Sequence, residues 1–223
     1  MMKTALIFGS TGLVGSELVK KLTESAEYSR VYLVNRRESG VVGEKIVEII
    51  FDYEQLVSNP EVLISKINEP IQVVFCTLGT TIKKAGSQNA FFRVDHDYVL
   101  ATAQLAEKIG ALTYVAVSAI GADPASSIFY SRVKGQAEKN IASLAFSAKA
   151  AVHFLRPSLL LGKRKEFRMG ERAAIILSPV LNLFMIGSLR RYRSIEASQV
   201  ASSMIRFAGD SRPGVWIHEN EVL

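Results

Sequence analysis

The chain is poor in cysteine and histidine: one cysteine, Cys76, and three histidines stand among 223 residues. A single cysteine excludes a disulfide framework and is typical of a protein from a reducing compartment. The histidines, His96, His153 and His218, lie far apart in the chain and have no second cysteine to join them. We therefore expect a cytoplasmic protein without a metal site.

Long hydrophobic runs are also missing. The longest, AAIILSPVLNLFMIG at 173–187, is too short to span a bilayer and is interrupted by Ser178, Pro179 and Asn182. The first 15 residues carry one lysine before an apolar stretch broken by glycines, and no small-residue cleavage site follows it. These features predict a soluble protein with neither a signal peptide nor a membrane span.

The net charge of +6 raises the question of a nucleic-acid partner. Aromatic residues are not interleaved with the basic ones in any strand-like platform, which argues against nucleic acid. Basic residues scattered over solvated faces, together with an anionic small ligand, account for the charge. The length and the ordinary composition, 48% hydrophobic and 22% charged, predict one domain over residues 1–223.

Short β-rich runs alternate with longer helical stretches. The expected strands cover residues 4–8, 30–34, 45–50, 72–76, 112–117 and 151–155, and the expected helices cover about 12–23, 89–109, 130–144 and 195–208. Near-continuous apolar strands separated by helices predict an α/β fold, a doubly wound parallel sheet covered on both faces. The rhythm becomes irregular after residue 155, which predicts a small C-terminal cap over about 157–193. In such folds the ligand lies beyond the carboxyl ends of the strands.

The first expected strand runs into FGSTGLVGSE, with Gly9, Gly12 and Gly15 at three-residue spacing. Glycines let such a turn close tightly, and they let backbone amides approach a pyrophosphate at the positive end of the following helix. The alternative is a strand–helix turn that merely needs glycine. A strand before the turn and an amphipathic helix after it favour dinucleotide binding.

The second expected strand ends in VNRRES. Asn35 stands where NAD enzymes usually have an acidic residue that holds the ribose 2′-hydroxyl, and Arg36 and Arg37 follow it. A carboxylate would repel a 2′-phosphate, whereas an arginine pairs with it through two charge-assisted hydrogen bonds. Two exposed arginines after a strand are the alternative, but the position favours NADP(H).

The segment IFYSRVKGQAE places Tyr130 and Lys134 four residues apart, on the same face of an expected helix. A bare Y-x-x-x-K spacing is a weak motif, because many helices carry it by chance. The rest of the chain has to decide whether these two residues form a catalytic pair.

Several blocks resemble the extended, atypical branch of the short-chain dehydrogenase/reductase family, and within it the Tat-interacting-protein oxidoreductases. The blocks stand in the order and spacing of that family and span nearly the whole chain: FGSTGLVG, FCTLGTT, KKAGSQNAFFRVDHDYV, VSAIGAD, FYSRVKGQAE and FLRPSLLLG. The resemblance implies a Rossmann fold and an NADP-dependent oxidoreductase acting on a small carbonyl or alcohol substrate. It also strengthens the Tyr130–Lys134 spacing as a signal.

The resemblance also implies where the cofactor binds. The pyrophosphate would lie at Gly9, Ser10, Thr11, Gly12, Leu13, Val14 and Gly15. The 2′-phosphate and adenine would lie against Arg36, with Arg37 as a helper and Asp52 facing the adenine. Leu78, Gly79 and Thr80 would line the adenosine ribose side, and Arg156, Pro157 and Ser158 would border the nicotinamide.

The catalytic group implied by the resemblance is Ser118, Tyr130 and Lys134. Ser118 would hydrogen-bond a substrate oxygen, and Tyr130 would be the acid for carbonyl reduction or the base for alcohol oxidation. Lys134 would stabilise the phenolate and hold the nicotinamide ribose. Asp95 stands where many members have asparagine; it would pair with Lys134 and weaken its effect on Tyr130, unless it faces the core or caps an element.

Two interpretations of different classes remain open from the sequence. One is the enzyme; the other is a regulator that senses the NADP/NADPH ratio and binds a protein partner. Ser118, Tyr130 and Lys134 favour the enzyme, while Asp95 and the short substrate region favour the regulator. Epimerase or dehydratase chemistry would use the same residues, and the sequence indicates neither the substrate nor the oligomeric state.

Overall fold

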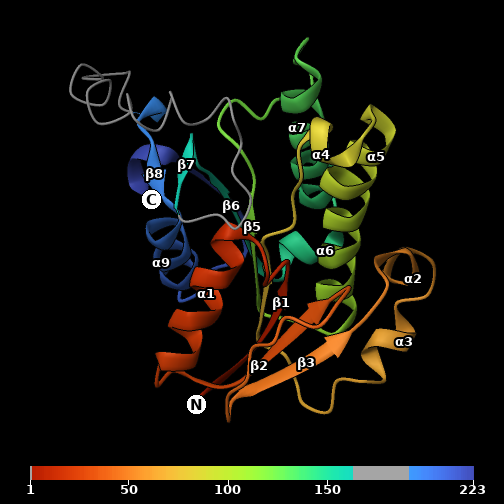
Figure 1. The fold of residues 1–223 in the computed structure, drawn as a ribbon, viewed down its shortest axis with the longest axis vertical. Helices are drawn as coiled ribbons and strands as arrows, with labels where there is room; N and C mark the ends of the chain where they lie inside the picture. The colour runs from red at the N-terminus through yellow and green to blue at the C-terminus, as the bar shows by residue number, and fades with distance from the viewer. Residues whose placement is uncertain (1, 163–190) are drawn as a thin grey trace.

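The computed structural model describes residues 2–162 and 191–223, and a seven-stranded parallel sheet forms its centre (Figure 1). Its strands are β1 (Lys3–Phe8), β2 (Tyr28–Asn35), β3 (Ile46–Ile50), β4 (Val73–Cys76), β5 (Thr113–Val117), β6 (Ala151–Arg156) and β9 (Gly214–Glu219). Their order across the sheet is β3-β2-β1-β4-β5-β6-β9. The strand order reverses between β1 and β4, the place where such sheets bind ligands. The prediction of a doubly wound α/β fold is confirmed.

Helices cover both faces of the sheet (Figure 1). Those of the described residues are α1 (Leu13–Glu24), α2 (Tyr53–Ser58), α3 (Glu61–Ile64), α4 (Ile82–Ala85), α5 (Gln88–Phe92), α6 (Val99–Lys108), α7 (Phe129–Ala142) and α9 (Ala197–Phe207), with the π-helix η1 (Arg93–Tyr98) and the 3₁₀ turns η2 (Ala145–Ala148) and η4 (Asn220–Val222). The buried residues of α1 and α9 form one core cluster with one face of the sheet, and those of α2, α6 and α7 form a second with the other face.

Burial on both faces explains why the inner strands are continuously apolar. In β1, Ala5 and Ile7 belong to the cluster of α1 and α9, whereas Leu6 and Phe8 belong to the cluster of α6 and α7. Successive side chains of a strand point to opposite faces, so a strand covered on both sides needs apolar residues at every position.

Several elements differ from what the sequence predicts; besides the two described next, the short helices α2, α3 and α4 were not predicted. The helix expected over 89–109 consists of α5, η1 and α6 in succession, and its middle turn is π-helical. The strand β9 was not predicted; it pairs in parallel with β6 at the edge of the sheet. Val215 and Ile217 of β9 are partly exposed, at 38% and 49%, so this strand lacks the two-sided burial that marks the inner strands.

The predicted cap over 157–193 lies mostly outside the described residues. Its two ends are described, and they approach each other: β7 (Leu160–Leu161) pairs in parallel with β8 (Ile195–Glu196) in a separate two-stranded sheet. The division of the chain into one domain with a small cap stays a prediction.

Candidate functional site

Three glycines stand at the passage from β1 to α1, two in the turn and Gly15 in the first turn of α1, and they differ in what the fold requires of them. Gly9 has a φ of +84°, which favours glycine, and a Cβ there would lie 2.8 Å from the carbonyl carbon of Thr77. A Cβ on Gly15 would lie 2.1 Å from the Gly9 carbonyl oxygen, so this glycine lets α1 pack against the turn. Gly12 has ordinary extended backbone, and the nearest atom to a Cβ there would be the Gly9 carbonyl oxygen at 3.2 Å.

The fold therefore demands Gly9 and Gly15 more strongly than Gly12. As the residue before α1, Gly12 offers no side-chain oxygen to cap the helix. The first amides of a helix need an acceptor, and the positive end of the helix dipole favours an anion there. Thr11 and Gly12 are exposed at this point, Leu13 is half-buried and Val14 is buried. The turn therefore presents exposed backbone at Gly12 and a helix start without a side-chain cap.

The end of β2 is polar inside and basic outside. Asn35 is buried; its Oδ1 accepts a hydrogen bond from Ser10 Oγ at 2.7 Å, and its Nδ2 donates to Glu48 Oε1 at 2.6 Å. Arg36 and Arg37 are exposed in the loop that follows. The hydroxyl proton of Ser10 is thus directed to Asn35, while the two arginines are accessible to a ligand.

Other residues predicted on the adenosine side lie in two further loops at the same edge of the sheet. Asp52 follows β3 and caps α2 by accepting a hydrogen bond from the Glu54 amide at 3.0 Å. Leu78, Gly79 and Thr80 follow β4, and of these Leu78 is buried and Gly79 exposed. Because parallel strands end at one edge, the predicted cofactor residues from β1 to β4 lie on the same side of the sheet.

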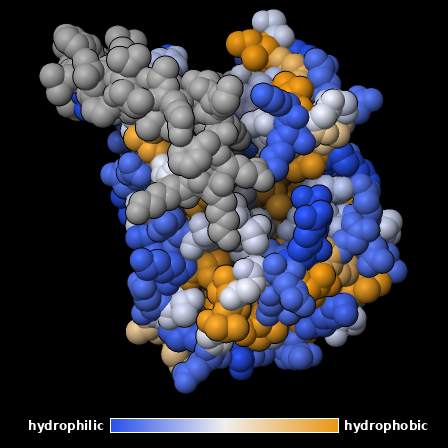
Figure 2. Space-filling model, viewed as in Figure 1, coloured by the Kyte–Doolittle hydropathy of each residue, from blue (hydrophilic) through white to orange (hydrophobic). Residues whose placement is uncertain are grey.

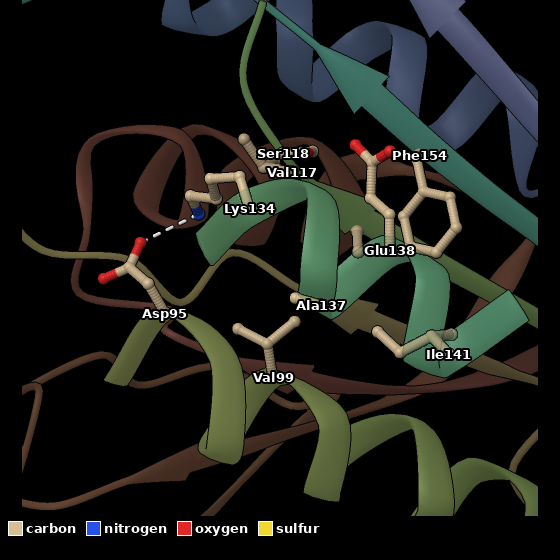
Figure 3. A pocket seen from close by; sticks show the side chains of 10 residues that line it. Asp95, Val99, Val117, Ser118, Lys134, Ala137, Glu138, Ile141 and Phe154 are labelled. Carbon is tan, nitrogen blue, oxygen red and sulfur yellow. Dashed lines mark ion pairs between the residues drawn. The ribbon is translucent and has the colours of Figure 1, made fainter. Parts of the chain in front are cut away.

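Lys134 of α7 and Asp95 of η1 form a buried ion pair, with 2.8 Å between Nζ and Oδ1 (Figure 3). Their side chains are 7% and 1% exposed. Asp95 Oδ2 also accepts a hydrogen bond from the Thr80 amide at 2.9 Å, and a Cβ on Gly79 would lie 3.4 Å from Oδ1. Asp95 is thus both buried and paired with Lys134, and the same carboxylate fixes the loop after β4.

The electrostatics of Lys134 follow from two opposing effects. Burial by itself lowers the pKa of the Lys134 ammonium, because a low dielectric disfavours the charged form. The Asp95 carboxylate, and after it Tyr130, outweigh burial and raise the pKa above its ordinary value. Lys134 is therefore a fixed cation at neutral pH, and its first partner is Asp95.

Ser118 follows β5 and lines a small cavity beside this ion pair (Figure 3). The cavity, about 10 Å³, has room for about one water molecule and is also lined by Asp95, Lys134 and Glu138. Ser118 Oγ is buried and has no hydrogen-bond partner among the described residues. Since an unsatisfied buried hydroxyl costs free energy, this hydroxyl is suited to a water or a ligand oxygen.

Tyr130 lies one helical turn before Lys134 on α7, at the exposed end of the helix. It is 36% exposed, and its ring packs against the buried Phe91 with ring centroids 5.5 Å apart. The ring is thereby held while the phenol remains accessible. The structure brings Ser118 and Lys134 to one cavity and places Tyr130 on the same helix face as Lys134.

Arg156 ends β6 and is occupied by carboxylates. Its Nε and Nη2 donate to the two oxygens of Glu138, at 3.1 and 2.6 Å, and its Nη1 donates to Glu219 at 3.0 Å. A two-pronged pair of this kind is strong and directional. The predicted position of Arg156 beside the nicotinamide would therefore have to rest on its backbone or require a change of partners.

The next two residues of this turn are held by their backbone. The Pro157 carbonyl accepts a hydrogen bond from the Ile120 amide at 3.0 Å, and the Ser158 amide donates to Asn220 Oδ1 at 2.9 Å. The turn is thus joined both to the loop after β5, which carries Ser118, and to the C-terminal segment.

Two acidic residues of the site were not identified from the sequence. Glu138 follows Lys134 by four residues, so its position on the same helix face was a usable signal. Glu48 is the one charged residue within the run IVEII of β3, and a charge inside an apolar strand was also a signal. In both cases the sequence could not indicate the partner, because the partner comes from a different element.

A parallel sheet with a glycine turn after its first strand, and a Ser, Tyr and Lys set at the same edge, define a short-chain dehydrogenase/reductase architecture. No protein-family profile matches the chain. Protein FMP52-1, mitochondrial, of Scheffersomyces stipitis is 36% identical over 162 residues, which cover 73% of this chain and 69% of the relative. Protein HTATIP2 of Rattus norvegicus is 35% identical over 172 residues, which cover 76% and 67%. The chain therefore belongs to the HTATIP2 and FMP52 family, an atypical group of short-chain dehydrogenases/reductases.

A solved structure supports the fold. The Bordetella bronchiseptica enzyme WbmF in complex with NAD⁺ matches with a TM-score of 0.69 at 16% identity, covering 96% of this chain and 72% of that chain. At this identity the match concerns the fold alone.

The expectation of a cytoplasmic location is wrong. Four FMP52 relatives, at 34% to 36% identity, are named mitochondrial. A low cysteine count indicates a reducing environment, and that property does not distinguish one reducing compartment from another.

Within residues 2–162 and 191–223, no helix combines the length and the hydrophobicity needed to cross a bilayer. The same residues contain no cluster of metal-binding side chains.

Proposed function

We propose that this protein is an NADP-dependent oxidoreductase that transfers a hydride to or from a small carbonyl or alcohol substrate, with Tyr130 as the acid or base. One observation carries the proposal: the Ser118 hydroxyl, which has no partner among the described residues, and the buried Lys134 ammonium line one cavity, with Tyr130 one turn away on α7. A neutral donor, a fixed cation and an accessible phenol are what proton transfer to a carbonyl oxygen requires. NADPH consumption over a panel of aldehydes, ketones and quinones tests the proposal.

The glycine turn fits a nicotinamide dinucleotide. The uncapped start of α1 and the space at Gly12 suit a pyrophosphate, and the fold is that of WbmF, whose structure contains NAD⁺. The exposed Arg36 supports NADP(H) as the form bound, with Arg37 beside it. When bound, the cofactor supplies or accepts the hydride.

The protein's own residues handle the proton and the substrate oxygen. In the reductive direction Tyr130 donates its phenolic proton to the substrate oxygen, and Ser118 Oγ donates a hydrogen bond to the same oxygen. The Lys134 ammonium stabilises the phenolate that remains, and the exposure of Tyr130 lets solvent return the proton. In the oxidative direction the phenolate removes the proton from the alcohol.

One observation favours a second function, a regulator that binds NADP(H) without turnover and engages a protein partner. The first partner of Lys134 is Asp95, which lies 2.8 Å away and cancels part of the positive charge that the Tyr130 phenolate would need. Under this function the phenol is part of a helix surface, and the substrate panel gives no turnover.

We expect unmutated protein to bind NADPH at least about tenfold more tightly than NADH, or about 1.4 kcal/mol. Arg36→Ala should remove most of this preference and leave NADH affinity nearly unchanged, because NADH lacks the 2′-phosphate with which the guanidinium pairs. Calorimetric titration of both cofactors measures this. Arg212→Ala removes an exposed arginine paired with Asp210 away from the turn and should leave the ratio unaltered. Equal affinities in the unmutated protein would exclude the NADP preference.

Gly12→Val is expected to abolish dinucleotide binding and to preserve the fold. Valine accepts the extended backbone of Gly12, and its Cβ requires a shift of only a few tenths of an ångström, so we expect a stability loss of about 1 kcal/mol. The matched variant Gly15→Ala should be severely destabilised, because its Cβ would lie 2.1 Å from the Gly9 carbonyl oxygen. Thermal unfolding measures the stability of the two variants, and calorimetry measures their binding of NADPH. Normal NADPH binding by Gly12→Val would show that the turn only connects β1 to α1 and does not bind the cofactor.

A further inference from the structure

Glu48 of β3 lies under the loop that carries the two exposed arginines. Its Oε1 accepts hydrogen bonds from Asn35 Nδ2 at 2.6 Å and from the Ser39 amide at 2.9 Å. Asn35 and Ser39 are the residues on either side of the loop segment 36–38. The residues at both ends of this segment are therefore hydrogen-bonded to the Glu48 carboxylate.

The same carboxylate is connected to the glycine turn. Ser10 Oγ donates to Asn35 Oδ1 at 2.7 Å, and the other end of that amide donates to Glu48. Two hydrogen bonds thus separate Glu48 from the turn proposed to hold the pyrophosphate. A dinucleotide that extends from this turn to Arg36 would pass the end of β2, where Asn35 binds Glu48.

Within the described part of the chain, no cation neutralises the negative charge of Glu48. Among residues 2–162 and 191–223, no lysine or arginine lies within ion-pair distance of it, and the groups that bind it are the neutral Asn35 and Ser39. Burial by itself raises the pKa of Glu48, but the hydrogen bonds from Ser39 and Asn35 outweigh burial and hold the pKa below its ordinary value. The carboxylate is charged at neutral pH.

We infer that Glu48 is a second determinant of cofactor choice, whose carboxylate opposes the 2′-phosphate that Arg36 attracts. This inference rests on the proposed binding of NADP(H). A like charge near the phosphate lowers affinity for NADPH and leaves NADH, which has a hydroxyl at that position, unaffected. The acidic residue that was sought at the end of β2 is thus supplied by the neighbouring strand, and the preference for NADPH is smaller than Arg36 alone would give.

The test is Glu48→Gln, which removes the charge and keeps an oxygen for Asn35 and Ser39. We expect the ratio of the NADH to the NADPH dissociation constant to rise about fivefold or more in low salt. The rise should shrink as salt is added, because salt screens the charge. Glu48→Asp keeps the charge and should keep the ratio. Glu44→Gln removes a charge just before the opposite end of β3 and should also leave the ratio unaltered.

Three results would overturn the inference, and they differ in what else they exclude. An unchanged ratio in Glu48→Gln, with the Arg36→Ala effect intact, excludes a role for Glu48 and leaves the proposed function standing. An equal loss of affinity for both cofactors shows that Glu48 only positions the loop. Failure of the unmutated protein to bind either cofactor overturns the proposed function together with the inference.

Discussion

Tyr130→Phe is expected to lower turnover at least about 100-fold, while NADPH affinity and melting temperature hardly change. The substitution removes one hydroxyl, and the ring that packs against Phe91 at 5.5 Å is retained. Loss of the proton donor affects the reaction and not the binding of the cofactor. The measurement is NADPH consumption with each reactive carbonyl of the panel, beside calorimetry of the cofactor.

Tyr28→Phe is the matched control, because it deletes the same atom at the far end of the sheet. The Tyr28 hydroxyl is buried without a hydrogen-bond partner among the described residues, so its removal should leave turnover intact and stability equal or higher. A Tyr130→Phe variant that reduces the same substrate at the unmutated rate would exclude Tyr130 as the acid. If the regulator function holds, Tyr130→Phe changes none of these properties.

The inner strands of the sheet could be predicted because the signal for each lies in consecutive residues of the sequence. Ala5, Leu6, Ile7 and Phe8 are apolar without interruption, and that run is enough to identify a strand covered on both faces. The glycine turn was identified for a similar reason: a left-handed residue and two close approaches to backbone require glycine at fixed spacing.

The polar part of the site could not be predicted to the same depth, because it depends on which elements meet. The sequence indicated Arg156 beside a nicotinamide, but Glu138 from α7 and Glu219 from β9 surround its guanidinium. The strand β9 was missed because Val215 and Ile217 are exposed at the sheet edge, so its apolar residues do not form a continuous buried run. Asn35 indicated that no acidic residue stands at the end of β2, yet Glu48 from β3 places its carboxylate in hydrogen-bond contact with Asn35.

The π-helical turn η1 is a further feature that periodicity does not reveal. Insertion of one residue into a helix changes the direction of the side chains that follow, and such turns occur often at functional sites. Asp95 lies in this turn and reaches both Lys134 and the Thr80 amide. The countercharge of the buried Lys134 is thus held by an irregular helix, and replacement of Asp95 should lower the stability of the fold strongly.

Asp95→Asn is expected to destabilise the protein by about 3 to 5 kcal/mol, because it leaves the buried Lys134 ammonium without its countercharge. Asparagine retains an oxygen for the Thr80 amide, so the loss of stability measures the effect of breaking the ion pair. The single variant Lys134→Met and the double variant Asp95→Asn/Lys134→Met complete the cycle. No unpaired charge remains in the double variant, so its loss of stability should be smaller than the sum of the losses of the two single variants by about 2 kcal/mol. Asp97→Asn changes the same atoms on the same turn but breaks the more exposed pair with Arg93, and it should cost about 1 kcal/mol or less. Urea unfolding of the four variants gives these values.

The pH dependence of Asp95→Asn provides an independent check on the cause. In the unmutated protein the pKa of Lys134 is raised, so this contribution to stability is fully present below the ordinary pKa of about 10.5 and declines only at higher pH. Without Asp95, burial remains the largest effect and should bring the pKa of Lys134 below that of the unfolded chain. The unfolded chain then binds the additional proton, so the stability of the variant should rise with pH while that of the unmutated protein does not. The stability deficit of Asp95→Asn should therefore narrow between pH 7 and pH 9.5, and a deficit of equal size at both pH values would show that the loss comes from packing and not from the uncompensated charge.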